Sequence, residues 1–200
     1  MIGHAVIFSI NNTKLVKFPF LCLDASGGHT IIYLFTDYDK FLIINETHDD
    51  AVGEALDKIG RLLGLPYPGG ISIDKIYDAK KATLPLIKHY PAIQSFSFSG
   101  VKTYVTNLIH QAKQKKQKID TTIIASSFLK WCVDELMIKV NHYLKCYKVN
   151  YLVVGGGVAA NSVLRKELSK LKSKVILVDK KYCGDNAAMI ANYAYLEANK

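Results

Sequence analysis

The chain has 200 residues, half of them hydrophobic, and carries a formal net charge of +9 at pH 7. That length suits one large domain or two small ones, and the apolar share is ample for a hydrophobic core. No apolar run is long enough for a transmembrane helix, and no charged-then-apolar secretion signal opens the sequence. We therefore expect a cytoplasmic protein that has no membrane partner.

The cysteines point to the same compartment. Cys22, Cys132, Cys146 and Cys183 are widely spaced and form no Cys-x-x-Cys pair. This spacing is typical of reduced thiols in a cytosolic protein, and it does not suit a disulfide framework or a zinc knuckle.

Positive charge is concentrated in the third quarter of the chain. Residues 101–150 contain nine lysines and three acidic residues, and the densest part is Gln111–Lys118. A basic surface attracts the phosphates of nucleic acids. A solvated lysine-rich loop is the alternative, since no aromatic residues are interleaved for base stacking. Both interpretations stay open.

The first part of the chain predicts three strands and a helix. Apolar runs predict strands over 18–23, 31–35 and 41–45. Thr47 and Asp50 resemble a capping box for a helix that runs to about Leu63. Gly53 and Gly60 lie off the apolar stripe of that helix and cost it about 1 kcal/mol each, so something should pack or bind closely against them. The stripe itself is Val52, Ala55, Leu56, Ile59, Leu62 and Leu63.

The middle of the chain is less regular. Residues 65–72 are rich in proline and glycine and predict a turn. The elements expected next are a helix over 73–81, an irregular stretch over 82–95 and a short strand over 96–99. Helical spacing then predicts helices over 102–113 and 121–145.

The end of the chain alternates strand and helix, which favours a parallel sheet. The predicted elements are strands over 151–154 and 174–178 and helices over 161–171 and 186–198. The glycines 155–157 join the first strand to its helix, where they let a ligand approach the backbone and offer amide groups to an anion. Asn161 can direct its amide at a ribose or a base. A tight turn without a ligand is the alternative, but further glycine motifs at 26–30, 67–70 and 184–189 favour a ligand.

Six motifs occur in an order that resembles a known family. They are Ser-Gly-Gly-His-Thr, Asp-Asp-Ala-Val-Gly-Glu-Ala-Leu-Asp-Lys, Leu-Gly-Leu-Pro-Tyr-Pro-Gly-Gly, Phe-Ser-Phe-Ser-Gly-Val-Lys-Thr, Gly-Gly-Val-Ala-Ala-Asn and Asp-Asn-Ala-Ala-Met. The chain is similar to the TsaD-type tRNA adenosine threonylcarbamoyltransferases, formerly named O-sialoglycoprotein endopeptidases. The similarity covers nearly the whole chain.

The resemblance implies an α/β fold of the actin-like/hexokinase-like ATPase (ASKHA) class, with two related lobes around a cleft. Residues 1–120 would complete the first lobe with a helical insert, and residues 121–200 would form the α/β unit of the second lobe. The family's N-terminal domain has no counterpart here, because Met1 falls inside the family's His-x-x-x-His pair. We therefore expect a truncated or split gene product.

The activity implied by the resemblance is transfer of a threonylcarbamoyl group from threonylcarbamoyl-adenylate. The acceptor is the N6 amine of the adenosine adjacent to the anticodon in ANN-decoding tRNAs, and AMP is released. The implied partners are tRNA, a paralogous TsaB-type subunit and a TsaE-type ATPase, while a separate enzyme makes the adenylate. A non-catalytic remnant or interaction protein of the same family is the alternative.

The resemblance also implies roles for individual residues, which are assigned by their position in the matching motifs. Asp24, Ala25, Ser26, Gly27 and Gly28 would lie along the adenylate or its phosphate. Asp57 and Gly70 would line the nucleoside pocket, and Asn161 would contact the adenosine. His29 would contact the phosphate or cap the hairpin.

His4 and Asp185 would hold one divalent metal, iron with zinc as the alternative, and the first histidine of the pair is absent. A carboxylate with an imidazole suits either metal. Capping of the last helix is an alternative role of Asp185, and it is compatible with metal binding. A metalloprotease is disfavoured, because the sequence lacks His-Glu-x-x-His, and a sugar kinase fits the ordered motifs poorly.

Overall fold

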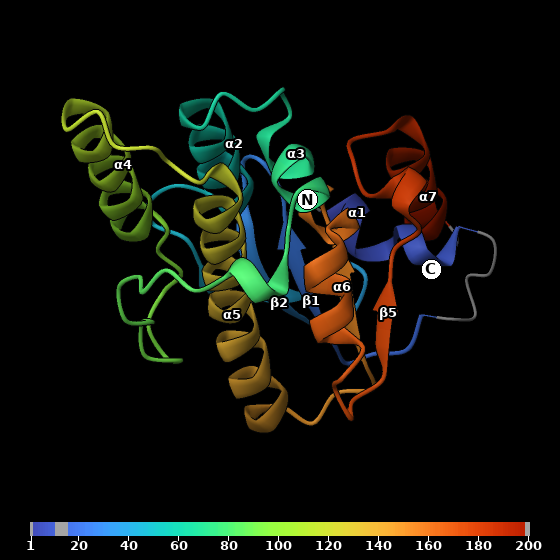
Figure 1. Ribbon diagram of the computed structural model, residues 1–200. Coiled ribbons are helices and arrows are strands. Elements are labelled where there is room, and N and C mark those ends of the chain that lie inside the picture. The colour runs from blue at the N-terminus through green and yellow to red at the C-terminus, as the bar shows by residue number, and fades with distance from the viewer. Residues whose placement is uncertain (1, 11–15, 199–200) are drawn as a thin grey trace.

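The computed structural model describes residues 2–10 and 16–198, and its strands form one mixed sheet of order β3-β2-β1-β4-β5 (Figure 1). The first three strands pair antiparallel, whereas β1 pairs parallel with β4 and β4 pairs parallel with β5. The strands are β1 (Phe20–Ala25), β2 (Thr30–Phe35), β3 (Phe41–Glu46), β4 (Leu152–Gly155) and β5 (Val175–Leu177). Both predicted ranges, 1–120 and 121–200, contribute strands to this sheet, so their boundary does not separate two sheets.

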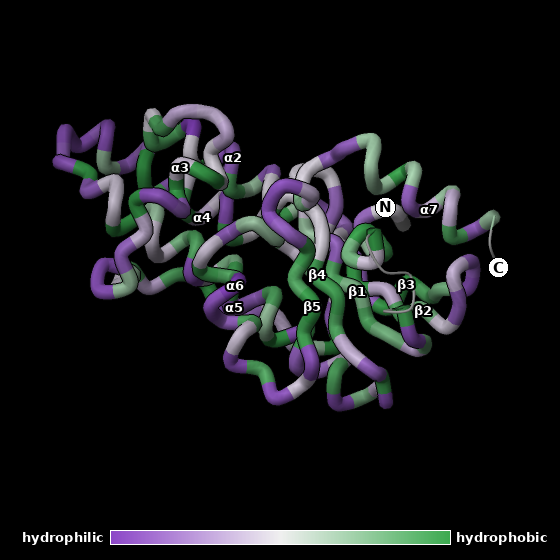
Figure 2. The backbone as a smooth tube through the Cα atoms, turned by 90° about the vertical axis from the view of Figure 1, so that its right-hand side faces the viewer, coloured by the Kyte–Doolittle hydropathy of each residue, from purple (hydrophilic) through white to green (hydrophobic). Residues whose placement is uncertain are grey.

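Helices cover both faces of the sheet, which explains why every residue of β1, β2 and β4 is buried. One face carries α2 (Val52–Leu62), α5 (Thr121–Cys146) and α6 (Ser162–Leu168), with α3 (Gly69–Lys75) and α4 (Ser99–Gln114) packed further out on α2. The other face carries α1 (Ile2–Val6) and α7 (Ala187–Ala198), and Figure 2 shows the apolar strands between the two helical layers. Short 3₁₀ turns complete the chain: η1 (Ile7–Ser9), η3 (Ala79–Lys81), η4 (Gly157–Ala160) and η5 (Lys180–Tyr182).

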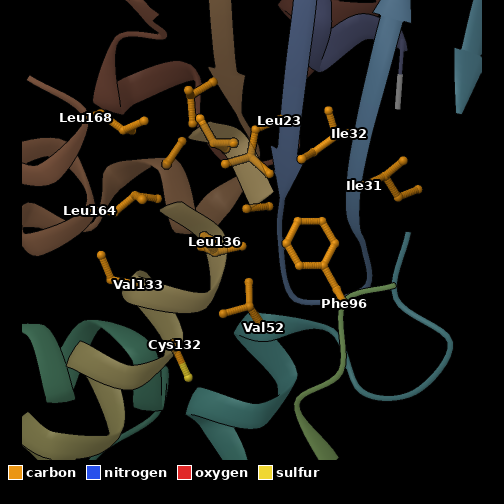
Figure 3. Close-up of a cluster of buried hydrophobic side chains, with 14 of the residues drawn as sticks. Leu23, Ile31, Ile32, Val52, Phe96, Cys132, Val133, Leu136, Leu164 and Leu168 are labelled. Carbon is orange, nitrogen blue, oxygen red and sulfur yellow. The ribbon is translucent and has the colours of Figure 1, made fainter. Parts of the chain in front are cut away.

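The main core lies between the sheet and α5. In Figure 3, Leu23 of β1 and Ile32 of β2 point toward Leu136 of α5, with Val52 of α2 and Leu164 of α6 beside them. All of these side chains are at most 1% exposed. Because side chains alternate along a strand, Asp24 must point to the opposite face, where α1 lies.

A second buried cluster holds the irregular stretch before α4 against α5. Glu135 and Lys139 are fully buried and pair at 2.5 Å. His89 Nδ1 lies 3.1 Å from Glu135, and the indole of Trp131 donates to the carbonyl of Ile87 at 2.7 Å.

Among the described residues no helix is both long and apolar enough to cross a membrane.

Strands β1 to β5, α2, α5 and the parallel pairing of the last strands are confirmed, but four predictions about local structure are wrong. The helix predicted over 73–81 does not form, because α3 ends at Lys75 and only the short turn η3 follows at Ala79–Lys81. Thr47 and Asp50 form no capping box, because α2 begins at Val52, whose amide donates to the hydroxyl of Thr30 at 2.9 Å. The predicted turn over 65–72 already contains the start of α3 at Gly69. The predicted strand over 96–99 is a single bridge from Phe96 to Thr47, because Ser99 begins α4.

The prediction that Gly53 and Gly60 face close neighbours is confirmed. A Cβ at Gly53 would lie 2.6 Å from the carbonyl oxygen of Ser26, and one at Gly60 would lie 2.7 Å from the Cα of Gly69. In both places the obstacle is backbone, which cannot rotate away. These two glycines therefore let α2 approach the β1–β2 turn and α3.

We expect Gly53→Ala to lower the free energy of unfolding by about 2 kcal/mol. Overpacking against backbone costs up to about 3 kcal/mol, whereas alanine returns only about 1 kcal/mol of helix propensity. Urea unfolding followed by circular dichroism measures the difference. The matched control is Gly28→Ala, since a Cβ there has no neighbour within 4 Å, and it should change stability by less than about 0.5 kcal/mol. Equal stability of Gly53→Ala and the unaltered protein would contradict the packing argument.

Candidate functional site

A pocket of about 500 Å³ opens beside the carboxyl ends of β1 and β4. One wall comes from α2 and α3 and includes Asp57 and Gly70, and the other comes from η4 and the start of α6 and includes Gly157 and Asn161. Gly27, in the β1–β2 turn, also lines it. The structure thus brings Gly27, Asp57, Gly70 and Asn161 of the predicted site to one cavity.

The other residues predicted along the adenylate do not line this pocket. Asp24 and Ala25 are buried in β1, at 1% and 0% exposure. Ser26 closes the β1–β2 turn, because its hydroxyl accepts from the amide of His29 at 3.0 Å and its own amide donates to the carbonyl of His29 at 2.8 Å. Gly28 and His29 are exposed in the same turn. The backbone of His29 therefore closes the hairpin, and its ring stays a predicted phosphate contact.

Asp57 fixes the shape of the α2–α3 wall. Its carboxylate accepts from the amide of Gly70 at 3.0 Å. A Cβ at Gly69 would lie 2.8 Å from the Cα of Asp57, so only glycine lets the first turn of α3 lie this close.

Asn161 has a structural role that determines which of its atoms remains for a ligand. Its side-chain oxygen caps α6 by accepting from the amide of Leu164 at 3.0 Å. The amide nitrogen, a donor only, is therefore the group that it can offer to a ligand.

The amides at the start of α6 are less available to an anion than the sequence suggested. The carboxylate of Asp74 accepts from the amide of Ser162 at 2.9 Å and from its hydroxyl at 2.7 Å. The amide of Leu164 is taken by Asn161. The cations that line the pocket are instead Lys75 and Lys180. No sequence pattern indicated Asp74 or Lys180, because their proximity depends on how α3 and η5 pack.

The three glycines after β4 have different roles. A Cβ at Gly155 would lie 2.8 Å from the carbonyl oxygen of His4, and one at Gly156 would lie 2.4 Å from that of Ala25. Gly156 also has a φ of 85°, which glycine adopts without strain. Only Gly157 has open space around it and lines the pocket.

His4, Asp24 and Asp185 meet on the other side of this turn. His4 Nδ1 lies 3.3 Å from Asp24 Oδ1, and His4 Nε2 lies 3.4 Å from Asp185 Oδ1. Neither ring nitrogen of His4 and neither oxygen of Asp24 has a hydrogen-bond partner, although all four are buried. The two predicted metal ligands, His4 and Asp185, are thus neighbours.

Asp185 does not cap the last helix, because the side chain of Asn186 accepts from the amide of Met189 at 3.0 Å. That alternative for Asp185 is therefore wrong. Its side chain is 91% exposed. Within the described ranges, no three His, Cys, Asp or Glu side chains surround one point as a complete metal shell.

The thiols near these sites are not nucleophiles. Burial raises the pKa of the Cys22 thiol, and the charge of Asp24 raises it further. Burial also raises the pKa of Cys132 and Cys183. All three thiols therefore stay protonated at neutral pH.

The chain matches the profile of the family described as "TsaD: tRNA N6-adenosine threonylcarbamoyltransferase" over residues 1–192. Similar proteins carry the same name in Ureaplasma parvum serovar 3 (52% identical, covering 96% of this chain), Malacoplasma penetrans (41%, 99%) and Streptococcus suis (42%, 100%). The chain spans only about 60% of the length of these relatives.

Solved structures show the fold class. Full-length HypF in a phosphate- and nucleotide-bound form aligns with a TM-score of 0.74 at 12% identity, covering 98% of this chain and 42% of HypF. Component A of the Acidaminococcus fermentans (R)-2-hydroxyglutaryl-CoA dehydratase aligns with a TM-score of 0.56 at 16% identity, covering 100% and 69%. The expected actin-like ATPase fold is confirmed, and with the profile match over 192 residues the chain belongs to the TsaD family of tRNA N6-adenosine threonylcarbamoyltransferases.

Proposed function

We propose that this chain takes part in the transfer of a threonylcarbamoyl group from threonylcarbamoyl-adenylate to the N6 amine of the adenosine adjacent to the anticodon in ANN-decoding tRNAs. The observation that supports this proposal is the pocket that Gly27, Asp57, Gly70 and Asn161 line together. These residues come from four separate motifs of the family, and packing alone does not require them to share a cavity.

The pocket suits the nucleotide half of the adenylate. The amide nitrogen of Asn161 donates to an acceptor on the adenosine, and Asp57 accepts from a ribose hydroxyl with the oxygen that Gly70 does not use. Lys75 and Lys180 attract the phosphate. In the reaction the N6 amine attacks the carbamoyl carbon, the bond from that carbon to the phosphate oxygen breaks, and the amine loses a proton as AMP leaves. We assign no side chain as the base.

The metal belongs to the same proposal. His4 Nε2 and Asp185 would hold one divalent metal, iron or zinc, and the unpartnered buried nitrogens of His4 fit such an ion. Such an ion, held by His4 and Asp185, would supply a Lewis acid that stabilises charge on the threonylcarbamoyl carbonyl. Further ligands come from outside the described residues or from substrate.

The proposed partners are tRNA, a TsaB-type paralogue and a TsaE-type ATPase, in the cytoplasm. Because the chain spans about 60% of its relatives' length, the full activity would also need the part of the fold that these 200 residues do not span.

The test is the level of threonylcarbamoyladenosine in tRNA from cells depleted of their own enzyme. We expect restoration when this chain is expressed together with the segment of the Ureaplasma parvum relative that it does not span. Mass spectrometry of digested tRNA measures the nucleoside. Failure to restore it with that segment, while the full-length relative restores it, would mean a non-catalytic member of the family.

Asn161→Asp separates the capping role of Asn161 from its ligand role. Aspartate keeps the oxygen that caps α6 but lacks the amide donor, so stability should hold while affinity for AMP falls about tenfold, the value of one hydrogen bond. Asn161→Ala should lose both the capping oxygen and the amide donor, and the free energy of unfolding should fall by about 1 kcal/mol. Calorimetric titration with AMP and urea unfolding measure the two effects. Unchanged AMP affinity in Asn161→Asp would remove the contact from the proposal.

The lysine-rich loop between α4 and α5 lies at the same end of the molecule as α3 (Figure 1), and its lysines are exposed. If they contact tRNA phosphates, neutralising them should weaken tRNA binding and reduce the slope of log affinity against log salt by up to about 3. The variant replaces four lysines by glutamine: Lys113 in the last turn of α4, and Lys115, Lys116 and Lys118 in the loop.

The matched control neutralises four exposed lysines at the opposite end of the molecule, around the end of α6, and should leave the salt slope unchanged. These are Lys166, Lys170, Lys172 and Lys174. Filter binding of unmodified tRNA at several salt concentrations gives both slopes. Equal slopes for the two variants would mean that the α4–α5 loop is only a solvated surface.

A further inference from the structure

We propose that Asp24 is a positioning residue for the metal site. Its carboxylate, which lies 3.3 Å from His4 Nδ1, would favour the Nδ1–H tautomer of His4 and so direct the lone pair of His4 Nε2 toward Asp185 and the metal. This inference rests on the metal of the proposed function, and it gives Asp24 a role different from the adenylate contact implied by the family resemblance.

The first argument is burial. Asp24 is 1% exposed and His4 is 5% exposed, and the polar side-chain atoms of both lack a hydrogen-bond partner. A carboxylate without a partner is costly in such a place, so it needs a donor. The ring of His4, with Nδ1 at 3.3 Å, is the group that faces it.

The second argument is the wall between Asp24 and the nucleotide pocket. Asp24 pairs in register with Gly155 of β4, and a Cβ at Gly156 would lie 2.7 Å from Asp24 Oδ1. The backbone of Gly156 therefore covers the carboxylate. Asp24 also points away from Leu23, whose side chain lies on the α5 face of the sheet (Figure 3). Asp24 is accordingly not among the residues that line the pocket.

The third argument is that the two carboxylates face different nitrogens of one ring. A single metal ion cannot bind both nitrogens of an imidazole, so Asp24 and Asp185 have different roles. Two ligands of one tetrahedral ion lie about 3.4 Å apart when their bonds are about 2.0–2.2 Å long. The separation of His4 Nε2 and Asp185 Oδ1 is 3.4 Å.

Exposure distinguishes the two sides of the ring. Asp185 is 91% exposed, which leaves room for substrate or further ligands beside Nε2. On the Nδ1 side both partners are buried, so that side has room for a hydrogen bond and not for an open metal site. Metal-binding histidines commonly donate their other ring nitrogen to a carboxylate, which fixes the tautomer and the ring orientation.

The experiment titrates the metal-free full chain with Co²⁺ and follows its visible absorption. Asp24→Ala should weaken Co²⁺ binding about 100-fold, and Asp24→Asn only about tenfold, because asparagine can still accept from Nδ1–H. Asp185→Ala should abolish saturable binding. Asp134→Asn is the matched control, since its half-buried carboxylate lies on α5 and pairs with Lys130, and it should bind as the unaltered chain does.

A second measurement needs no metal. Nitrogen-15 spectra of the histidine rings should show the Nδ1–H tautomer of His4 in the unaltered chain and its loss in Asp24→Ala. If Asp24→Ala does not fold, Asp24→Asn tests the proposal by itself. A Co²⁺ affinity of Asp24→Asn between those of the unaltered chain and Asp185→Ala would support the proposal.

Three results would overturn it. If the Asp24 variants keep the Co²⁺ affinity and the His4 tautomer of the unaltered chain, Asp24 is a structural residue and does not position His4. If Asp24→Asn loses Co²⁺ binding as completely as Asp185→Ala does, Asp24 is a direct metal ligand. No Co²⁺ binding by the unaltered chain would overturn the metal of the proposed function as well, whereas the AMP titrations would still test the pocket.

Discussion

The parallel pairing of β1 with β4 joins two distant parts of the chain, and both sites depend on it. Asp24 at the end of β1 lies in register with Gly155 at the end of β4. The turns that follow these strands supply Gly27 to the pocket from one side and Gly157 from the other. Without this register, the pocket would lose the contributions of both turns at once, and His4 would lose the buried carboxylate that it faces.

Glycine makes the close approach of these segments feasible. At Gly53, Gly60, Gly69 and Gly156 a methyl group would lie within 2.4–2.9 Å of backbone atoms, which is closer than packed atoms approach. The contacts join α2 to the β1–β2 turn, α2 to α3, and the β4–η4 turn to β1. Segments that touch through backbone have little freedom to shift, so the pocket is largely formed before a ligand enters, which favours binding because less ordering is needed.

The sequence predicted whatever depends on local pattern. Apolar periodicity located β1, β2 and α5, and the unfavourable placement of Gly53 and Gly60 in a helix correctly indicated close neighbours. It did not predict the start of α3, because Gly69 and Gly70 favour a turn until Asp57 of α2 accepts the amide of Gly70. Nor did it indicate that Asp74 reaches Ser162 or that Asp24 faces His4, since both contacts join segments far apart in the chain. The family motifs brought Asn161 to attention, but only the structure shows that its oxygen is already used to cap α6.

The Gly155–Gly157 turn separates the two halves of the proposed reaction. Gly157 faces the pocket, where the nucleotide would bind, while Gly155 and Gly156 pack against His4, Ala25 and Asp24. A mixed anhydride of AMP has its reactive carbonyl directly after the phosphate, so this carbonyl must lie near the turn when the adenosine is in the pocket. On the far side of the same turn lie His4 and Asp185, which under the proposal would hold the ion for that carbonyl. Because this one turn lines the pocket and packs against His4, a nucleotide bound as proposed would place its carbonyl at a fixed position relative to the ion, and such placement would lower the entropic part of the barrier to acyl transfer.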